Sequence, residues 1–158
     1  EIKRHIGYLP ENNPLYQEMP VIDYLEFCAR INDIEKSKVA ARVADMIRIT
    51  GLNSEKHKKI FELSKGYRQR VGLAQAMIHD PEILILDEPT SNMDNRSEIR
   101  LKGYLQNAIK EKTLILITHR ASLLEMVNRL IVIDNGSIVA DGPKDFVLEA
   151  MKRGQLRV

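Results

Sequence analysis

An α/β domain with a largely parallel sheet is the fold that this sequence predicts. Short apolar runs suited to strands alternate along the chain with longer segments whose apolar residues recur at helical spacing. Such alternation is typical of strand–helix–strand units, in which neighbouring strands run parallel. A hydrophobic content of 44% in 158 residues can supply the core of one domain, or of a large part of one.

Five segments are predicted strands. The clearest is the run at residues 83–86 (ILIL), where four apolar residues, two of them β-branched, predict a buried strand. Asn135 and Gly136 are a strong hairpin signal, because both residues tolerate positive φ. The predicted strands cover residues 6–9, 83–86, 114–118, 130–134 and 137–141.

Five helices are predicted around these strands. Pro20 suits the first turn of one helix, and Ser64 is well placed to cap another that ends before Asp80 and Pro81. The helices are expected at about residues 20–28, 35–50, 64–79, 101–109 and 146–151. The first three stand between strands 6–9 and 83–86 and therefore predict an all-helical insert.

Composition excludes several classes of partner. The net charge is +2, and the few aromatic residues are not interleaved with basic ones, which argues against nucleic-acid binding. The single cysteine, Cys28, cannot form an internal disulfide and is expected in the core, which fits a reducing compartment. No apolar run approaches the length of a membrane span, so no direct membrane insertion is expected.

Two carboxylates, Asp87 and Glu88, follow the strand predicted at residues 83–86. The carboxyl ends of parallel strands are where α/β proteins bind ligands. An Asp followed by a Glu at such an edge suits a Mg²⁺ ligand followed by a general base. The alternative is a strand that ends in an ordinary acidic turn.

Four further motifs surround this pair. They are residues 7–11 (GYLPE), 63–70 (LSKGYRQR), 91–94 (SNMD) and 117–120 (ITHR). Together with residues 83–90, their order and spacing resemble the Q-loop, signature, D-loop, H-loop and Walker B motifs of ABC transporter ATP-binding domains. The resemblance covers essentially the whole chain and implies a P-loop NTPase-like (RecA-like) fold.

The resemblance also implies a domain organisation. Residues 1–14 and 81–158 would form the α/β core, and about 15–80 the helical subdomain that carries the signature motif. The sequence contains no G-x-x-x-x-G-K-[ST] motif, the loop that cradles nucleotide phosphates and that precedes the Q-loop in this family. We therefore expect a partial, N-terminally truncated ABC ATPase domain.

Catalytic and metal-binding roles follow from the resemblance. Asp87 would ligate Mg²⁺, Glu88 would orient and deprotonate the attacking water, and His119 would lie beside the γ-phosphate. The alternative for His119 is a strand-end histidine bonded to backbone. Glu11 stands where many members have Gln; it could ligate Mg²⁺ or be an exposed loop residue.

The signature motif at residues 63–70 is expected to bind phosphate through a helix start and not through carboxylates. In the family this helix start binds the γ-phosphate of ATP held by the other subunit, through Ser64 and backbone amides at Gly66, where free N–H groups and the helix dipole favour anions. Lys65 and Tyr67 depart from the commonest form, Leu-Ser-Gly-Gly-Gln. Asp94 would contact the partner subunit. An ordinary Ser-capped helix has the same geometry.

The function implied is that of the ATP-binding and ATP-hydrolysing part of an ABC exporter, with ATP and Mg²⁺ as cofactors. Its partners would be transmembrane domains and a second ATP-binding domain in a homodimer, on the cytoplasmic face of the inner or plasma membrane. Alternatively, the chain is an inactive fragment or engineered chimera that acts only as an interaction or fold module. A DNA-repair ATPase is disfavoured, because no sustained heptads occur.

The two halves of the chain resemble different exporters. Residues up to 70 resemble the ATPases of two-component exporters, including the gliding-motility group. Residues from 91 onward resemble fused exporters of the type I secretion and bacteriocin class. A mosaic joined near residues 88–91 is therefore a hypothesis. The transported substrate cannot be named, because transmembrane domains would select it.

Overall fold

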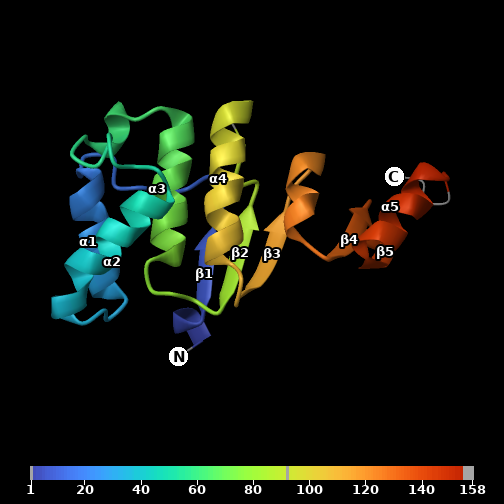
Figure 1. Cartoon of the computed structure of the whole chain (residues 1–158), viewed down its shortest axis with the longest axis horizontal. Helices are drawn as coiled ribbons and strands as arrows, with labels where there is room; N and C mark the ends of the chain where they lie inside the picture. Colours follow the sequence, from blue (N-terminus) through green and yellow to red (C-terminus); the bar gives the residue numbers. More distant parts are fainter. Residues whose placement is uncertain (1, 92, 155–158) are drawn as a thin grey trace. The chain divides into compact units, whose positions relative to one another are not determined.

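The computed structural model describes residues 2–91 and 93–154 and divides into two compact units, Glu1–Thr118 and His119–Val158. Figure 1 shows the chain with its elements labelled. The first unit contains η1 (Ile2–Arg4), β1 (Ile6–Leu9), α1 (Val21–Ile31), α2 (Lys36–Ile49), η2 (Ile60–Glu62), α3 (Lys65–Met77), β2 (Ile83–Asp87), α4 (Asn95–Ala108) and β3 (Thr113–Ile117). The second contains η3 (Ala121–Met126), β4 (Arg129–Asp134), β5 (Ser137–Pro143) and α5 (Lys144–Lys152).

The sheet of the first unit has three parallel strands in the order β1–β2–β3. Its register places Ile6 opposite Ile83, and Leu84 opposite Leu114. Helices connect each strand to the next, as parallel pairing requires. The α/β prediction and its parallel sheet are confirmed.

Three helices, α1, α2 and α3, stand between β1 and β2 in the chain, which confirms the predicted helical insert. The first two pack on each other and on α3, and α3 packs on β1. Figure 1 shows α3 between the α1–α2 pair and the sheet. The longest helices, α2 and α4, have 14 residues each. In the part of the chain described here, no helix is long and apolar enough to span a membrane.

The sheet is buried on one face only. Leu9, Leu84 and Leu86 are fully buried, whereas Tyr8, between β1's two buried positions, is half exposed. Alternate strand residues point to opposite faces, so one row of side chains packs under the helices and the other does not. The prediction of a buried strand at residues 83–86 therefore holds for Leu84 and Leu86 but is wrong for Ile83 and Ile85, which are only partly buried.

A glycine allows β1 to approach α3 closely. A Cβ atom at Gly7 would lie 2.1 Å from the carbonyl oxygen of Ala76 and 2.8 Å from Cγ of Pro81. No side chain fits in that space. The strand and the carboxyl-terminal part of α3 therefore pack backbone to backbone at this point.

The second unit is a hairpin covered by a helix. Strands β4 and β5 pair antiparallel through the predicted turn, in which Asn135 and Gly136 both have positive φ. Helix α5 packs on this hairpin with Val147 buried. The predicted hairpin and final helix are confirmed.

Candidate functional site: a pocket at two helix starts

The amino-terminal end of α3 carries the first part of the site. Ser64 is the N-cap residue, and its Oγ accepts a long hydrogen bond of 3.4 Å from the Tyr67 amide. The cap predicted from sequence is confirmed, although the predicted helix end near residue 79 lies two residues beyond the observed one. A helix start of this kind presents backbone N–H groups and a partial positive charge.

The amino-terminal end of α4 carries the second part. Asp94 caps this helix: Oδ1 accepts from the Ser97 amide at 2.9 Å, and Oδ2 accepts from the Ser97 hydroxyl at 2.8 Å. These bonds, the backbone one first, lower the pKa of the Asp94 carboxyl. The Asp94 carboxylate therefore already accepts hydrogen bonds from the first turn of α4. The helix begins at Asn95, earlier than the predicted residue 101, because this cap extends it.

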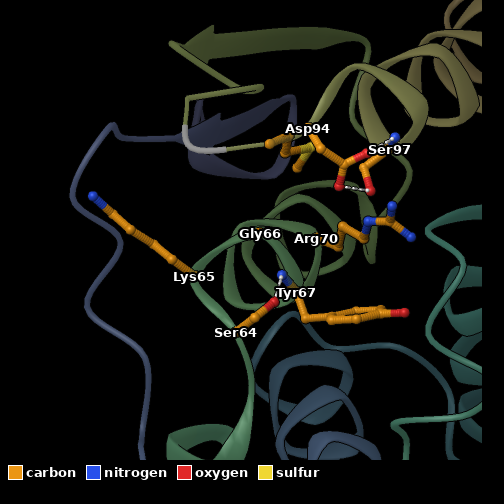
Figure 2. Close-up of a pocket in the computed structure, with 8 residues that line it drawn as sticks. Ser64, Lys65, Gly66, Tyr67, Arg70, Asp94 and Ser97 are labelled. Atoms are coloured by element: carbon orange, nitrogen blue, oxygen red, sulfur yellow. Dashed lines mark hydrogen bonds between the residues drawn. The ribbon is translucent and has the colours of Figure 1, made fainter.

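The two helix starts share one pocket of about 180 Å³. That volume is below the range typical of sites for whole drug-sized ligands and suits a single small group. Figure 2 shows Tyr67 and Arg70 side by side, with Asp94 and Ser97 on the other side of Arg70, while Lys65 extends away from them. The pocket is lined by Ser64, Lys65, Gly66, Tyr67, Arg70, Met93, Asp94 and Ser97.

The signature residues and Asp94 thus lie in this one pocket, whereas His119, Asp87 and Glu11 do not line it. Signature residues 64–67 and Asp94, far apart in sequence, come together because α3 and α4 start side by side. Sequence reasoning missed Arg70, Met93 and Ser97. Helical spacing could have identified Arg70, because it lies three residues after Tyr67 and so on the same helical face. It could also have identified Ser97, which lies three residues after the cap residue Asp94.

Arg70 is the least expected of these residues. Its side chain lies deep in the fold, and the residue is only 7% exposed. The guanidinium carbon lies 5.1 Å from the centroid of the Tyr67 ring, a cation–π contact. A guanidinium and the amides of a helix start both favour an anion in this pocket, beside the Asp94 carboxylate.

The carboxyl end of β2 forms a neighbouring site. Asp87 is the last residue of the strand, and Glu88 has a φ of 46°, in the left-handed region. The chain therefore turns between the two carboxylates, which confirms that the strand ends there. Thr118 Oγ1 donates to Glu88 Oε2 at 3.3 Å, and the Glu88 amide donates to the Ile117 carbonyl at 2.9 Å. Strained backbone held in this way is a frequent feature of functional sites.

A side chain from α3 reaches this second site. The Nε2 atom of Gln69 donates to the Glu88 carbonyl oxygen at 3.5 Å, the long limit for a hydrogen bond. Gln69 is itself only 7% exposed. The helix that carries the pocket therefore also contacts the turn that carries Glu88.

The proposed metal ligands are hard oxygen donors. Asp87 is partly buried at the sheet edge, and Glu11 is exposed in the loop after β1. Within residues 2–91 and 93–154, no group of three or more His, Cys, Asp or Glu side chains could hold a metal ion. Mg²⁺ usually takes one or two carboxylates and completes its shell with water and substrate phosphates. The residues present therefore fit Mg²⁺ when it arrives with a nucleotide.

His119 opens the second unit, directly after Thr118. It lies in a bend between β3 and η3. Its expected place beside a γ-phosphate stays a prediction.

Known proteins resemble this chain in sequence. A family model described as ABC transporter matches residues 1–91, more than half of the chain. The Bacillus subtilis ABC transporter ATP-binding protein YxlF is 34% identical over 137 residues, which are 86% of this chain and 46% of that protein. The Methanocaldococcus jannaschii ABC transporter ATP-binding protein MJ1023 is 34% identical over 154 residues, 96% of this chain and 58% of that protein. The chain thus spans about half the length of these relatives.

A solved structure agrees on the fold. The dimeric, post-hydrolysis structure of the ATP-binding cassette MJ0796 with ADP and Pi superposes with a TM-score of 0.82. The match covers 90% of this chain and 64% of that chain at 21% identity. This likeness establishes the fold and leaves the chemistry to the residues themselves.

Proposed function

The chain belongs to the ABC transporter family as part of an ATP-binding domain, and we propose that it forms the signature-bearing part of an exporter's ATP-hydrolysing unit. The observation that carries the proposal is the pocket that unites signature residues 64–67 with Asp94. Helix starts bind phosphate through their free amides, and this pocket has two of them. A phosphate is also the size of group that the pocket suits.

The pocket would act on ATP held by a second ATP-binding domain. Ser64 Oγ and the amide of Gly66 would donate to the γ-phosphate, and Asp94 would lie at the contact between the two domains. Such a γ-phosphate bridges the domains, so ATP would draw them together and hydrolysis would release them. A homodimer supplies two such pockets by symmetry.

Glu88 is the proposed general base. Its carboxylate would accept a proton from the water that attacks the γ-phosphate, and Thr118 would orient it through the 3.3 Å hydrogen bond. Asp87 and Glu11 would hold Mg²⁺, which neutralises phosphate charge when bound. His119 would contact the γ-phosphate.

Transmembrane domains are the proposed partners, with the ATP-binding domains on the cytoplasmic face of the membrane. The exporter direction is supported by the motifs at residues 63–70 and 117–120, which resemble those of exporter ATPases. One relative, 33% identical, is a sulfate/thiosulfate import ATP-binding protein from Nocardia farcinica, so family membership alone does not set the direction.

ATP turnover tests the proposal. We expect the 158-residue chain to hydrolyse little ATP by itself, because it contains no G-x-x-x-x-G-K-[ST] loop, and to gain activity when a relative's amino-terminal segment with that loop is joined to it. No activity in either protein would contradict the proposal and favour a non-catalytic interaction module.

Two substitutions in the joined protein assign the roles. Glu88→Gln should nearly abolish turnover yet keep ATP binding, because an amide cannot accept the proton. His119→Ala should lower turnover by about 100-fold. Glu111→Gln, which removes an exposed carboxylate elsewhere, is the matched control and should hydrolyse at the parent rate. A Glu88→Gln protein with parent activity would show that another group is the base.

A further inference from the structure

We propose that Arg70 is an anion-binding residue of the pocket at the start of α3, and that its guanidinium contacts a phosphate oxygen of the bound nucleotide. The proposal rests on the proposed function, in which this pocket receives a phosphate. In this proposal the phosphate is bound by the backbone amides at the start of α3 and also by a side-chain cation, Arg70, which lies about two helical turns further along the same helix.

The first argument is that the donors of Arg70 face the pocket and not the fold. The residue is only 7% exposed, and its guanidinium lines the pocket. Among residues 2–91 and 93–154, the guanidinium makes no hydrogen bond and no ion pair; it contacts the Tyr67 ring. Its nitrogen atoms are not among the fully buried side-chain atoms that lack a partner, so solvent reaches them through the pocket. An anion that enters the pocket can therefore replace water at these donors.

The second argument is preorganisation. The Tyr67 ring lies 5.1 Å from the guanidinium carbon on one side. Gly51, just after the end of α2, lies on another, because a Cβ there would come within 3.0 Å of Arg70 Nη1. A helix end is partly negative and favours a cation nearby. These neighbours fix the guanidinium in place while leaving its N–H donors unused.

The third argument is that the carboxylate in the same pocket forms its hydrogen bonds elsewhere. Asp94 lines the same pocket, but both of its oxygens accept hydrogen bonds from Ser97. No ion pair within 4.0 Å joins Asp94 to Arg70 in the described structure. Figure 2 shows the guanidinium between the Tyr67 ring and the Asp94–Ser97 pair. The donors of the guanidinium are therefore not taken up by the carboxylate that shares the pocket.

The fourth argument concerns the kind of anion. A guanidinium presents a planar fork of donors that matches the oxygens of a phosphate or a carboxylate. The same pocket contains the amino-terminal amides of α3, which favour phosphate. Its small volume admits one phosphate group rather than a base and sugar. A phosphate oxyanion, free or as the end of a polyphosphate chain, is therefore the ligand class.

Calorimetry with sodium tripolyphosphate tests the proposal on the full chain. We expect the parent chain to bind it saturably, and Arg70→Gln to bind about tenfold more weakly, as loss of one charge-assisted contact predicts. Arg70→Lys, which keeps the charge without the fork, should fall between them. Arg100→Gln removes the same charge from an exposed position of α4 and should bind like the parent.

The outcomes separate the two proposals. Equal affinity of the parent and Arg70→Gln, with weaker binding by Ser64→Ala, would overturn the role of Arg70 and keep the phosphate pocket. Equal losses in Arg70→Gln and Arg100→Gln would show a general charge effect and overturn it too. No binding by the parent chain would overturn both proposals. Orthophosphate and ATP, titrated in parallel, distinguish a free anion from a nucleotide phosphate as the source.

A measurement on the parent chain covers the case in which Arg70→Gln does not fold. The Nε–H resonances of the arginine side chains are followed by NMR while tripolyphosphate is added to the parent chain. The Arg70 resonance, assigned from its absence in Arg70→Lys, should shift with the same saturation curve as the calorimetry. An Arg70 resonance that does not move while the anion binds would overturn the proposal.

Discussion

The two ends of α3 each hold a guanidinium, and the fold treats the two differently. At the carboxyl end, Arg42 of α2 donates to the carbonyl oxygens of Met77 and Ile78, both at 2.7 Å, and lies 3.4 Å from Asp80. Lys112 donates to the same Asp80 at 2.8 Å. At the amino end, Arg70 is more deeply buried and has no such bond within the described residues.

This difference separates stability from binding. Carbonyl groups at a helix end need donors, and Arg42 supplies them, so its charge stabilises the fold. Arg70 lies in the pocket at the start of α3, where the partly positive helix end does not stabilise a cation but does favour an anion. The donors of Arg42 are taken up by the fold, whereas those of Arg70 face the pocket and remain available to a ligand.

The largest expected effect on stability lies at the carboxyl end of α3. Gly7→Ala should destabilise the chain by about 3 kcal/mol, because its Cβ would overlap the Ala76 carbonyl and force β1 away from α3. Urea unfolding followed by circular dichroism measures it.

Gly103→Ala is the matched control for this change. It has nothing within 4 Å of its new Cβ and lies inside α4, so it should stabilise by about 0.5–1 kcal/mol. If the two alanines had equal effects, the close contact between β1 and α3 would not exist in solution.

The next prediction compares how much Arg42 and Arg70 contribute to stability. Arg42→Gln should lower the free energy of unfolding by about 2 kcal/mol, because two carbonyl oxygens lose charged donors. Arg70→Gln should lower it by less, because its guanidinium makes no hydrogen bond and no ion pair to the described residues and only the contact with the Tyr67 ring is lost. Urea unfolding of both variants in phosphate-free buffer decides. A larger loss for Arg70→Gln would mean that Arg70 is structural and that the contrast between the ends is wrong.

The smallest effect is a pH dependence at the carboxyl end. Burial first, then nearby Arg42 and Lys112, lowers the pKa of His79 below its ordinary value of 6.5, although its bond to the Ile6 carbonyl and nearby Asp80 oppose this. The unfolded chain therefore takes up this proton first as the pH falls. Stability should be full above pH 6.5 and decrease as the pH drops through the lowered pKa.

His79→Gln tests that assignment. Its free energy of unfolding, measured from pH 5 to 7.5, should change less with pH than that of the parent. The range stays above the titration of Asp80, whose pKa is lowered from 3.8, chiefly by the hydrogen bond from Lys112. An unchanged slope would assign the pH dependence to other groups.

Sequence patterns predicted the elements well because each depends on neighbours close in the chain. The strand at residues 6–9, the Ser64 cap and the turn at Asn135 and Gly136 all follow local rules, and the structure has each of them. The pocket's signature residues could be named in advance by resemblance.

Properties that depend on distant packing could not be predicted. The contact of Arg70 with the Tyr67 ring follows from helical spacing, but its contact with Gly51, just after α2, depends on distant packing that no local pattern predicts. The positive φ of Glu88 depends on its bonds to Ile117, the last residue of β3, and to Thr118 just after it. The half-exposed face of β2 depends on which elements cover the sheet, and an apolar run alone does not tell one covered face from two.

The most direct test of the contrast between the ends of α3 is a map of where an anion binds. Backbone amide shifts of the chain are recorded by NMR as sodium tripolyphosphate is added. We predict that the largest changes fall on residues 64–67 and 94–97, with little change at residues 77–80. Changes of equal size at residues 77–80, or changes centred on the basic cluster at residues 57–59, would contradict the assignment of the pocket as the phosphate site.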